Sequence, residues 1–332
     1  MAEPIILLGF GDTPESAALR ERVERLAPGY RVLVTHDDAV VRAHLDDIEI
    51  AAGRMPREMM LSAPRLRWMQ QWGAGADWLL RAPEAAQAPF VLTNASGVHA
   101  QPIGEHIMAL VLAFSRGLHR ALRSQAEGRW QRPEMHDGIS ELAGQTMLLI
   151  GVGAIGERTA QFAAAFGMRV VGVRRDPSAP AEGVAEMHGP ADLPDLLPEA
   201  DAVVLTVPLT HETRHMIGEA QLCAMKRTAF LINIGRGGTI DEAALVRALQ
   251  EGWIAGAGLD VFEREPLPED SPLWKMENVI ITAHYSGRTP RYEERASAIF
   301  DPVDPRPAAA YLSILGSRGL RRIRPHKRTI AT

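Results

Sequence analysis

The stretch Gln145-Thr-Met-Leu-Leu-Ile-Gly-Val-Gly-Ala-Ile-Gly156 decides the fold of this 332-residue chain. Residues 147–150 are continuously apolar, as in a short buried strand, and a G-x-G-x-x-G turn made by Gly151, Gly153 and Gly156 follows them. In a dinucleotide site the first glycine permits a tight turn, the second lets the backbone approach a pyrophosphate, and the third lets helix and strand pack closely. Free N–H groups and the helix dipole then favour the anion.

The residues after this turn supply the context that the motif needs. A helix is predicted over 157–166, with Gly167 placed as a left-handed C-cap, and a second strand is predicted over 169–173. A glycine motif without this context is often an ordinary loop. Because strand, turn, helix and strand occur in the required order, the sequence favours a dinucleotide-binding unit.

Composition excludes several classes of protein. The chain has 36 Lys and Arg against 41 Asp and Glu, a net charge of −5, which gives no global attraction for nucleic acid or an anionic membrane surface. Its length suggests two domains. The single cysteine, Cys223, excludes an intramolecular disulfide and a cysteine-based metal site, and we expect it to be a small buried hydrophobe. The sequence shows no basic leader and no apolar run of membrane-spanning length, so a cytoplasmic protein is expected. No metal is expected in the site.

Two α/β regions are predicted. Alternating strands and helices over 1–97 indicate a small parallel α/β domain. A long helix is expected over 98–123, and the segment 126–142 is interpreted as an arm that packs on another subunit. A second α/β alternation then follows. The predicted strands of the first region are 5–10, 31–35, 46–52, 67–71 and 90–93. Those of the second are 147–150, 169–173, 202–207, 229–234, 254–259 and 279–282, with helices at 193–197, 219–225 and 241–250.

Three polar side chains follow predicted strand ends of the second region. Arg236 follows strand 229–234, Glu265 follows the strand ending near 259, and His284 ends the last strand. Each has an ordinary explanation, as a solvated arginine, a carboxylate in a surface run, or a structural histidine. Because the carboxyl ends of parallel strands meet at one edge of a sheet, we expect the three to converge beside the glycine turn.

Together these residue types match hydride transfer between a nicotinamide and a carbon that bears oxygen. Reduction of a carbonyl needs a proton donor, and histidine suits that role near neutrality. A carboxylate beside the ring orients it and favours its protonated form. A guanidinium holds a substrate carboxylate in a planar, bidentate way. The Gly-rich loop at 72–77 could hold a carboxylate through its N–H groups or be an ordinary turn.

Over about residues 45–300 the chain resembles the D-isomer-specific 2-hydroxyacid dehydrogenases. The resemblance rests on several motifs in one order: the Gly-rich loop at 73–77, Gly151-Val-Gly-Ala-Ile-Gly156, Leu205-Thr-Val-Pro-Leu-Thr-His-Glu-Thr-Arg214, Ile232-Asn-Ile-Gly-Arg-Gly237, Leu259-Asp-Val-Phe-Glu-Arg-Glu-Pro-Leu267 and Thr282-Ala-His284. Formate dehydrogenases, which are relatives, pair the histidine with a glutamine, so Glu265 argues against that branch.

The resemblance implies a fold and a site. The fold is α/β with two domains, in which a Rossmann dinucleotide-binding domain (98–286) is inserted in a flavodoxin-like substrate domain (1–97 and 287–332). It implies a homodimer through the nucleotide-binding domain and a small 2-oxo or 2-hydroxy acid as substrate. The implied catalytic residues are Arg236, Glu265 and His284, and the implied substrate-binding residues are Ala74, Gly75 and Arg236. The predicted cofactor-binding residues combine the glycine turn, the positions that the resemblance implies and the two arginines after the second strand of this region: Gly151, Gly153, Ala154, Ile155, Gly156, Arg174, Arg175, Val207, Pro208, Thr213, Ile234, Gly235, Arg236, Asp260, His284, Ser286 and Gly287.

The chain departs from the family pattern twice. Where NAD-specific sites carry an acid for the ribose hydroxyls, this chain has Arg174-Arg175, which favours the 2′-phosphate of NADP(H). Asp176 lies ahead of Pro177, which should turn it away from the ribose. If both arginines are simply solvated, NAD(H) also serves. After Phe300 the family's helical sequence is replaced by a Pro- and Arg-rich tail, which is expected to be disordered or loosely attached.

The preferred hypothesis is an NADP(H)-preferring 2-oxoacid reductase, such as a glyoxylate or hydroxypyruvate reductase. The competing hypothesis is a nucleotide-sensing binding protein, like the transcriptional corepressors that use the same fold. The complete Arg236, Glu265 and His284 set favours the enzyme.

Overall fold

The computed structural model describes residues 3–73, 75, 88–130 and 138–302. The chain divides into two compact units, one formed by residues up to Val98 together with the described residues from Thr289, and the other by His99–Arg288. Each unit is built on a fully parallel sheet, so the predicted α/β class is confirmed.

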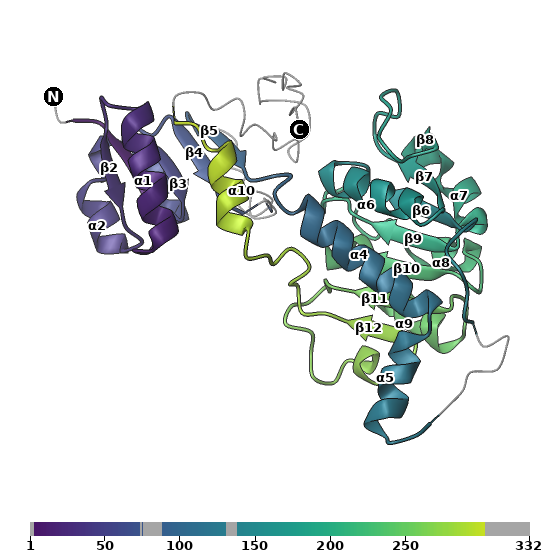
Figure 1. Ribbon diagram of the computed structural model, residues 1–332. Helices are drawn as coiled ribbons and strands as arrows, with labels where there is room; N and C mark the ends of the chain where they lie inside the picture. Colours follow the sequence, from purple (N-terminus) through teal and green to yellow (C-terminus); the bar gives the residue numbers. More distant parts are fainter. Residues whose placement is uncertain (1–2, 74, 76–87, 131–137, 303–332) are drawn as a thin grey trace. The chain divides into compact units, whose positions relative to one another are not determined.

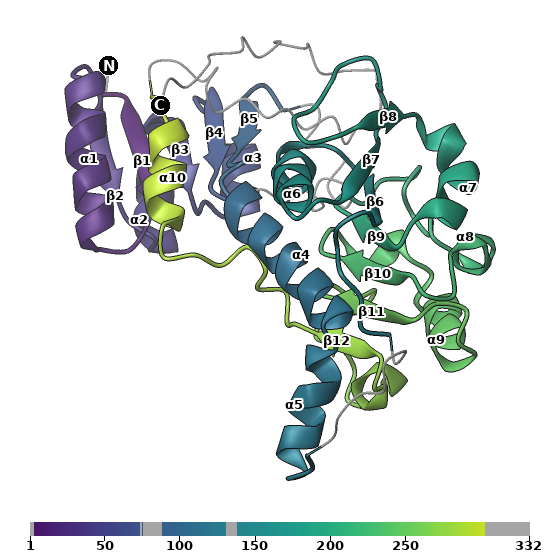
Figure 2. The same ribbon diagram turned by 45° about the vertical axis from the view of Figure 1, so that its right-hand side comes forward.

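The first unit has a five-stranded sheet in the order β2-β1-β3-β4-β5, which is the strand order of flavodoxin-like folds. The two faces of β1 bury alternate residues: Ile6 and Leu8 join one apolar cluster and Ile5 and Leu7 the other. Figures 1 and 2 show α1 and α10 side by side over one face of the sheet. The strands are β1 (Ile5–Gly9), β2 (Arg31–Val34), β3 (Ile48–Gly53), β4 (Trp68–Gln71) and β5 (Val91–Asn94); the helices are α1 (Pro14–Leu26), α2 (Asp38–Ala43), α3 (Arg57–Ser62) and α10 (Tyr292–Ile299).

Helix α10 joins this unit from the far end of the described chain. The guanidinium of Arg22 on α1 donates to the carbonyl oxygen of Phe300 at 3.1 Å and to that of Ser297. The Phe300 ring is fully buried and its centroid lies 5.2 Å from that of Trp68. The helix therefore forms before the sequence departs from the family pattern. The expected loose tail lies, from residue 303 on, outside the described residues.

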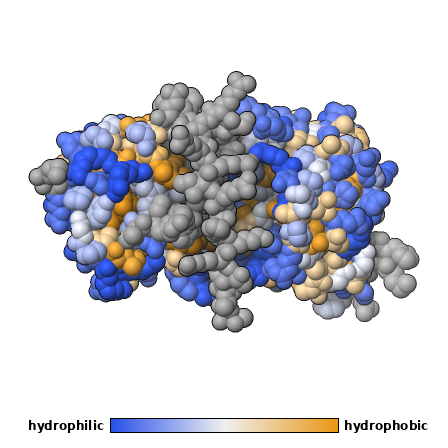
Figure 3. Space-filling model, turned by 90° about the horizontal axis from the view of Figure 1, so that it is seen from above, coloured by the Kyte–Doolittle hydropathy of each residue, from blue (hydrophilic) through white to orange (hydrophobic). Residues whose placement is uncertain are grey.

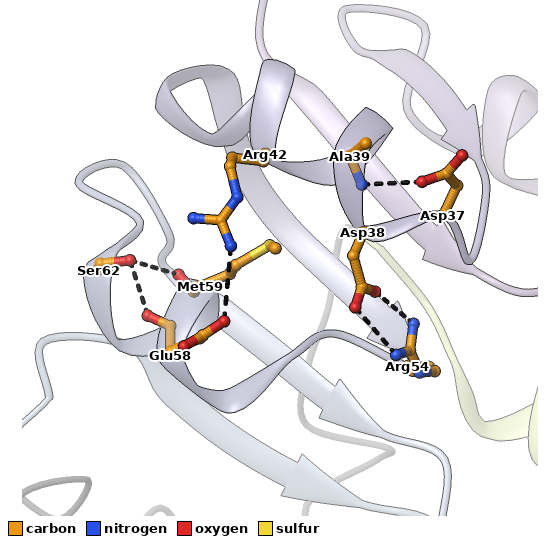
Figure 4. Close-up of polar contacts among 8 residues, drawn as sticks. All are labelled: Asp37, Asp38, Ala39, Arg42, Arg54, Glu58, Met59 and Ser62. Atoms are coloured by element: carbon orange, nitrogen blue, oxygen red, sulfur yellow. Dashed lines mark hydrogen bonds and ion pairs between the residues drawn. The ribbon is translucent and has the colours of Figure 1, made fainter.

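Exposed ion pairs hold α2 of the first unit to the segments that follow it (Figure 4). Nη1 of Arg54 lies 2.6 Å from Oδ1 of Asp38, and Nη2 of Arg42 lies 3.5 Å from Oε1 of Glu58. The hydrogen bond from Arg54 is the main reason that the pKa of Asp38 is lowered. Because these pairs are exposed and mutually satisfied, they indicate local stabilisation of modest size and no chemistry.

The second unit has a seven-stranded sheet in the order β12-β11-β10-β9-β6-β7-β8. The chain order reverses between β6 and β9, and this is where doubly wound folds bind ligands. Six strands were expected; β8 was missed because it is short, lies at the edge and carries polar residues. The strands are β6 (Thr146–Ile150), β7 (Arg169–Val173), β8 (Glu186–His188), β9 (Ala202–Leu205), β10 (Phe230–Asn233), β11 (Gly256–Leu259) and β12 (Val279–Ile281).

Helices cover both faces of this sheet (Figure 1). One apolar cluster lies between the sheet and α4 and α6, and the other between the sheet and α8 and α9. The helices are α4 (Ala100–Ser115), α5 (Leu118–Ala126), α6 (Ala154–Ala165), α7 (Leu193–Leu196), α8 (Glu219–Ala224) and α9 (Glu242–Gln250), and short 3₁₀ turns are η1 (Leu45–Asp47) in the first unit and η4 (Pro190–Asp192), η5 (Leu197–Glu199), η6 (Gly237–Thr239) and η7 (Pro272–Lys275) in the second.

Three local predictions were wrong. The helix expected over 98–123 is two helices, because Gly117 adopts a left-handed φ of 66° between them. Helix α6 begins at Ala154, inside the glycine motif, rather than at 157, although Gly167 ends it with the expected positive φ of 77°. Cys223 is exposed rather than buried, because the inward face of α8 is filled by Leu222.

The surface is mostly hydrophilic, with small hydrophobic patches, in the view of Figure 3. Among the exposed large apolar side chains of the second unit, three belong to α5 and its continuation: Leu118, Leu122 and Trp130 are 49%, 65% and 94% exposed. Residues 131–137 of the expected arm lie outside the described residues. None of the helices in the described parts of the chain is long and apolar enough to cross a membrane.

Candidate active site

The glycine turn lies at the carboxyl end of β6, where the strand order reverses. Gly151 has a φ of 103°, and a Cβ there would lie 2.8 Å from Cγ1 of Val207. A Cβ on Gly156 would lie 2.3 Å from the carbonyl oxygen of Gly151, so both positions require glycine. A Cβ on Gly153 would meet no heavy atom within 4 Å, and this residue is the N-cap of α6. The backbone is therefore tightly folded at two glycines and open at the third, which fits a diphosphate at the helix N-terminus.

The segment after β7 would face the adenosine end of a dinucleotide. Nε of Arg174 donates to the carbonyl oxygen of Asp176 at 2.7 Å, and its Nη2 donates to that of Ala179. Arg174 thus shapes its own loop, whereas Arg175 is exposed. Oδ1 of Asp176 accepts from the backbone N and the Oγ of Ser178 at 3.1 and 2.6 Å. The hydroxyl hydrogen bond is the main cause of the lowered pKa of Asp176, whose carboxylate therefore faces its own turn.

The loop after β9 is held by threonine side chains. Oγ1 of Thr213 donates to the carbonyl oxygen of Pro208 at 2.6 Å and accepts from the backbone N of Thr210 at 2.8 Å. The hydroxyl of Thr206 donates to the carbonyl oxygen of Gly151, which joins this loop to the glycine turn. Val207 is half-buried beside that turn.

The loop after β10 carries Arg236. Oδ1 of the buried Asn233 accepts from the backbone N of Gly235 at 3.0 Å, and its Nδ2 donates to the carbonyl oxygen of Arg236 at 3.0 Å. A Cβ on Gly235 would lie 2.7 Å from the carbonyl oxygen of Val207, so the loop can pass close to the preceding one only with glycine here. Arg236 is half-buried, and its Nη1 donates to the carbonyl oxygen of Gly235 at 2.7 Å. Ile234 is buried beneath this loop.

His284 and Glu265 form a direct pair. Nδ1 of His284 lies 2.7 Å from Oε2 of Glu265, and Oε1 of Glu265 accepts from the backbone N of Phe262 at 3.1 Å. The side chains are 50% and 36% exposed. An ionised carboxylate accepts only, so the proton of this bond belongs to Nδ1 of the imidazole. The opposite nitrogen, Nε2, is then the one available to exchange a proton with a bound molecule.

Asp260 anchors the segment that carries His284. Its side chain is fully buried and accepts from Oγ1 of Thr282 at 2.6 Å and from the backbone N of Tyr285 and of Ser286, each at 3.1 Å. The backbone N of His284 donates to the carbonyl oxygen of Asp260 at 2.9 Å. His284 has a φ of 52°, which is uncommon for a residue other than glycine. These hydrogen bonds hold it in that conformation.

A second set of side chains supports the same segment. Nε2 of His106 lies 3.1 Å from Oγ1 of Thr282. Since Thr282 gives its one proton to Asp260, it accepts from His106 here. Burial lowers the pKa of His106, although the charge of Asp260 acts in the opposite direction. The carbonyl oxygen of Gly287 lies 3.0 Å from Nδ1 of His99.

The loops that carry Arg236 and Glu265 touch through their backbones. A Cβ on Gly237 would lie 1.8 Å from the carbonyl carbon of Phe262. Arg236, Glu265 and His284 all belong to the unit His99–Arg288. In the described parts of the chain, no group of three His, Cys, Asp or Glu side chains could hold a metal ion.

Two of the three residues expected to hold the substrate carboxylate, Ala74 and Gly75, come from the other unit. Ala74 lies outside the described residues. The carbonyl oxygen of Gly75 accepts from Nε2 of Gln71, which also donates to that of Gly73 at 2.9 Å. Gln71 thus folds the start of the Gly-rich loop.

The sequence carries no signal that marks His106 as part of the site, nor a further pair, His215 and Glu263. Thr282 stands out only as a member of the Thr282-Ala-His284 motif.

Comparison with known proteins gives a consistent result. Residues 108–286 match the description "D-isomer specific 2-hydroxyacid dehydrogenase, NAD binding domain". A protein of Korarchaeum cryptofilum named glyoxylate reductase is 42% identical over 253 residues, which cover 74% of this chain and 72% of that protein.

Solved structures agree in fold. A D-isomer specific 2-hydroxyacid dehydrogenase family protein from Aeromonas salmonicida subsp. salmonicida is 32% identical, with a TM-score of 0.75 over 90% of this chain and 94% of that one. An NADPH-dependent glyoxylate/hydroxypyruvate reductase from Sinorhizobium meliloti, in complex with NADP and sulfate, is 28% identical, with a TM-score of 0.71 over 89% and 91% of the two chains.

Proposed function

Because the chain belongs to the D-isomer specific 2-hydroxyacid dehydrogenase family and is an NAD(P)-dependent oxidoreductase, we propose that it reduces small 2-oxo acids, with glyoxylate and hydroxypyruvate as the first candidates and NADPH as the preferred cofactor. The observation that carries the proposal is the hydrogen-bonded pair of His284 and Glu265, 2.7 Å apart, in the same unit as Arg236. The names of the similar proteins support the choice of substrate.

Each side chain has a defined task in this reaction. Arg236 holds the substrate carboxylate through its planar guanidinium and polarises the neighbouring carbonyl. Nε2 of His284 donates a proton to the carbonyl oxygen as that oxygen gains charge. Glu265 keeps the ring in the tautomer with its proton on Nδ1 and stabilises the imidazolium form before transfer. The nicotinamide, when bound, supplies the hydride that the carbonyl carbon accepts, so that a 2-oxo acid becomes a 2-hydroxy acid.

The unit His99–Arg288 is assigned to the cofactor. Gly151, Gly153 and Gly156 would hold the diphosphate at the N-terminus of α6, with Ala154 and Ile155 in the first turn. The loops at Val207, Pro208 and Thr213 and at Ile234 and Gly235 would line the nicotinamide half, with Asp260, Ser286 and Gly287 behind His284. The first unit is assigned to the substrate, through Gly75 and Ala74.

The preference for NADPH rests on the segment after β7. Arg175 is exposed, and its charge is one of the smaller contributions to the lowered pKa of Glu212, whose main cause is a hydrogen bond from Thr210. Arg175 therefore lies near the loop that follows β9. The carboxylate of Asp176 accepts a hydrogen bond from the hydroxyl of Ser178. We therefore do not expect it to bind the ribose hydroxyls, as the acidic residue of NAD-specific sites does. These features favour a 2′-phosphate.

A homodimer through the second unit is part of the proposal. Leu118, Leu122 and Trp130 present apolar surface on α5 and its continuation, and interfaces are enriched in such aromatic and apolar anchors.

The experiment is a panel of 2-oxo acids assayed with NADPH and with NADH at one salt concentration. Turnover of glyoxylate or hydroxypyruvate, higher with NADPH, is expected. Cofactor binding without turnover of any 2-oxo acid would favour the nucleotide-sensing binding protein instead.

A further inference from the structure

A second histidine–glutamate pair lies beside the first along the chain, because the two glutamates belong to the same short segment. Nε2 of His215 lies 2.6 Å from Oε1 of Glu263, and Glu263 is two residues before Glu265. His215 has a φ of 49°, the second positive value among non-glycine residues in the described parts of the chain. Its backbone N donates to the carbonyl oxygen of Gly238 at 2.9 Å. An uncommon backbone conformation is thus kept at a residue whose side chain reaches the Glu265 loop.

Glu263 also contacts the start of α9. Its backbone N donates to Oε2 of Glu242 at 3.1 Å. Glu242 is half-buried, and burial raises its pKa. The hydrogen bond from the backbone N of Glu263 acts against this rise, and the charge of the Glu263 side chain adds to it. The backbone between Phe262 and Glu263 lies directly against Gly237. The short segment before Glu265 is therefore held from three sides: by His215, by Glu242 and by the loop that carries Arg236.

We propose that His215 and Glu263 are positioning residues for the proton donor: their pair fixes the segment Phe262–Glu265 so that the carboxylate of Glu265 meets Nδ1 of His284. This inference rests on the proposed function. The mechanical link is short, because Glu265 itself accepts from the backbone N of Phe262 at 3.1 Å, next to Glu263. A displaced segment moves Glu265 from His284.

Electrostatics act in the same direction. The negative charge of Glu263 disfavours the charged form of Glu242. The imidazole of His215 offers the Glu263 carboxylate a hydrogen-bond donor. When that donor is removed, Glu263 is expected to turn away from Glu242 and to draw the segment with it.

A simple stabilising surface pair is the alternative, and the two differ in what they change. The side chains of His215 and Glu263 are 44% and 37% exposed, so their contribution to global stability is expected to be small. A positioning role appears instead in the protonation of His284, because a carboxylate beside a histidine favours the charged ring.

Four variants separate these readings. His215→Asn keeps a residue that tolerates positive φ but shortens the side chain. Glu263→Ala removes the oxygen that accepts from His215. Glu263→Gln keeps an accepting oxygen but removes the negative charge. Glu219→Ala is the matched control, since Glu219 forms an exposed pair with Arg247 at 3.1 Å in the same unit and is not part of the segment Phe262–Glu265.

The main measurement is the titration midpoint of the His284 ring by NMR in protein without cofactor, with the resonance assigned by its absence in His284→Ala. We expect His215→Asn and Glu263→Ala to lower this midpoint by about half a pH unit or more. Both variants should also lower kcat for glyoxylate about tenfold and leave KM little changed. Glu263→Gln and Glu219→Ala should match the wild type in all three. Thermal unfolding midpoints should stay within a few degrees of each other.

An unchanged His284 midpoint in both His215→Asn and Glu263→Ala, with folded protein, would overturn the inference. So would an equal shift in Glu219→Ala. If the wild-type protein turns over no 2-oxo acid, the proposed function fails, but the NMR midpoint still tests the contact between the two pairs.

Discussion

Oε2 of Glu265 lies 2.7 Å from Nδ1 of His284, while Oε1 of the same carboxylate is held by the backbone N of Phe262 at 3.1 Å. Both oxygens are thus in place before a ligand binds. Such a carboxylate needs little rearrangement when charge develops on the ring, which is the property expected of a partner to a general acid.

His284→Ala removes the proposed proton donor. We expect turnover of 2-oxo acids to fall by about two to four orders of magnitude, which is the usual contribution of a general acid. Affinity for the cofactor, measured by fluorescence titration, should be retained. Turnover within a few-fold of the wild type would show that another group donates the proton.

Arg236→Lys keeps the positive charge but loses the planar fork that binds a carboxylate in two places. A large loss in kcat/KM for glyoxylate is expected, measured by steady-state kinetics at saturating cofactor. Arg247→Lys, at an exposed arginine of the same unit, is the control and should change nothing. An unaltered kcat/KM in Arg236→Lys would mean that this guanidinium does not bind the substrate.

Gly156→Ala and Gly153→Ala should fail in different ways. A Cβ on Gly156 would lie 2.3 Å from the carbonyl oxygen of Gly151, so the turn must deform and both stability and cofactor binding should suffer. A Cβ on Gly153 meets nothing within 4 Å, so thermal stability should be kept while cofactor affinity falls, because the methyl group occupies the approach to the phosphates. Equal stability of the two variants would contradict the geometry of the turn.

Arg175→Ala tests cofactor choice with less disturbance than a change at Arg174, whose guanidinium holds its own loop through Asp176 and Ala179. We expect weaker binding of NADPH and unchanged binding of NADH, measured by titration at one fixed salt concentration. Arg174→Asp should also weaken NADPH more than NADH. Tighter or equal binding of NADH by the wild-type protein would refute the preference.

The pKa of Glu242 gives a prediction about stability. Burial raises it above the ordinary value of 4.5, so the folded state favours the protonated carboxyl. The stability that this group contributes is present below pH 4.5 and is lost as the pH rises through the raised value. Glu242→Gln keeps an acceptor for the backbone N of Glu263 and should raise the unfolding midpoint at pH 7 more than at pH 4. A larger rise of the unfolding midpoint at pH 4 than at pH 7, measured by calorimetry, would contradict the raised pKa of Glu242.

Much of the fold could be predicted from the sequence, because buried parallel strands are continuous apolar runs. Strand β6 and the glycines after it are recognisable for that reason. Strand β8 was missed because Glu186, Met187 and His188 form an edge strand without an apolar run. The break at Gly117 was missed because an apolar helical pattern continues on both sides of it.

The candidate site also contains residues that the sequence predicts and residues that it does not. Arg236, Glu265 and His284 follow strand ends, and the position of a strand end can be predicted. The pairing of His215 with Glu263 depends on a positive φ and on loop contacts between residues far apart in sequence. The pattern of apolar residues along the sequence does not indicate such a contact between loops.

The separate apolar clusters of the two units bear on how the molecule melts. One pair of clusters belongs to the sheet of the first unit and the other pair to the sheet of the second. Two cores of this kind are two potential cooperative blocks, and a multi-domain protein that unfolds block by block is not described by a single free energy of unfolding. A nucleotide held only by the second unit adds its binding free energy to that block alone. We therefore expect heat-capacity curves of this protein to contain two transitions, of which only the one from the second unit moves with cofactor concentration.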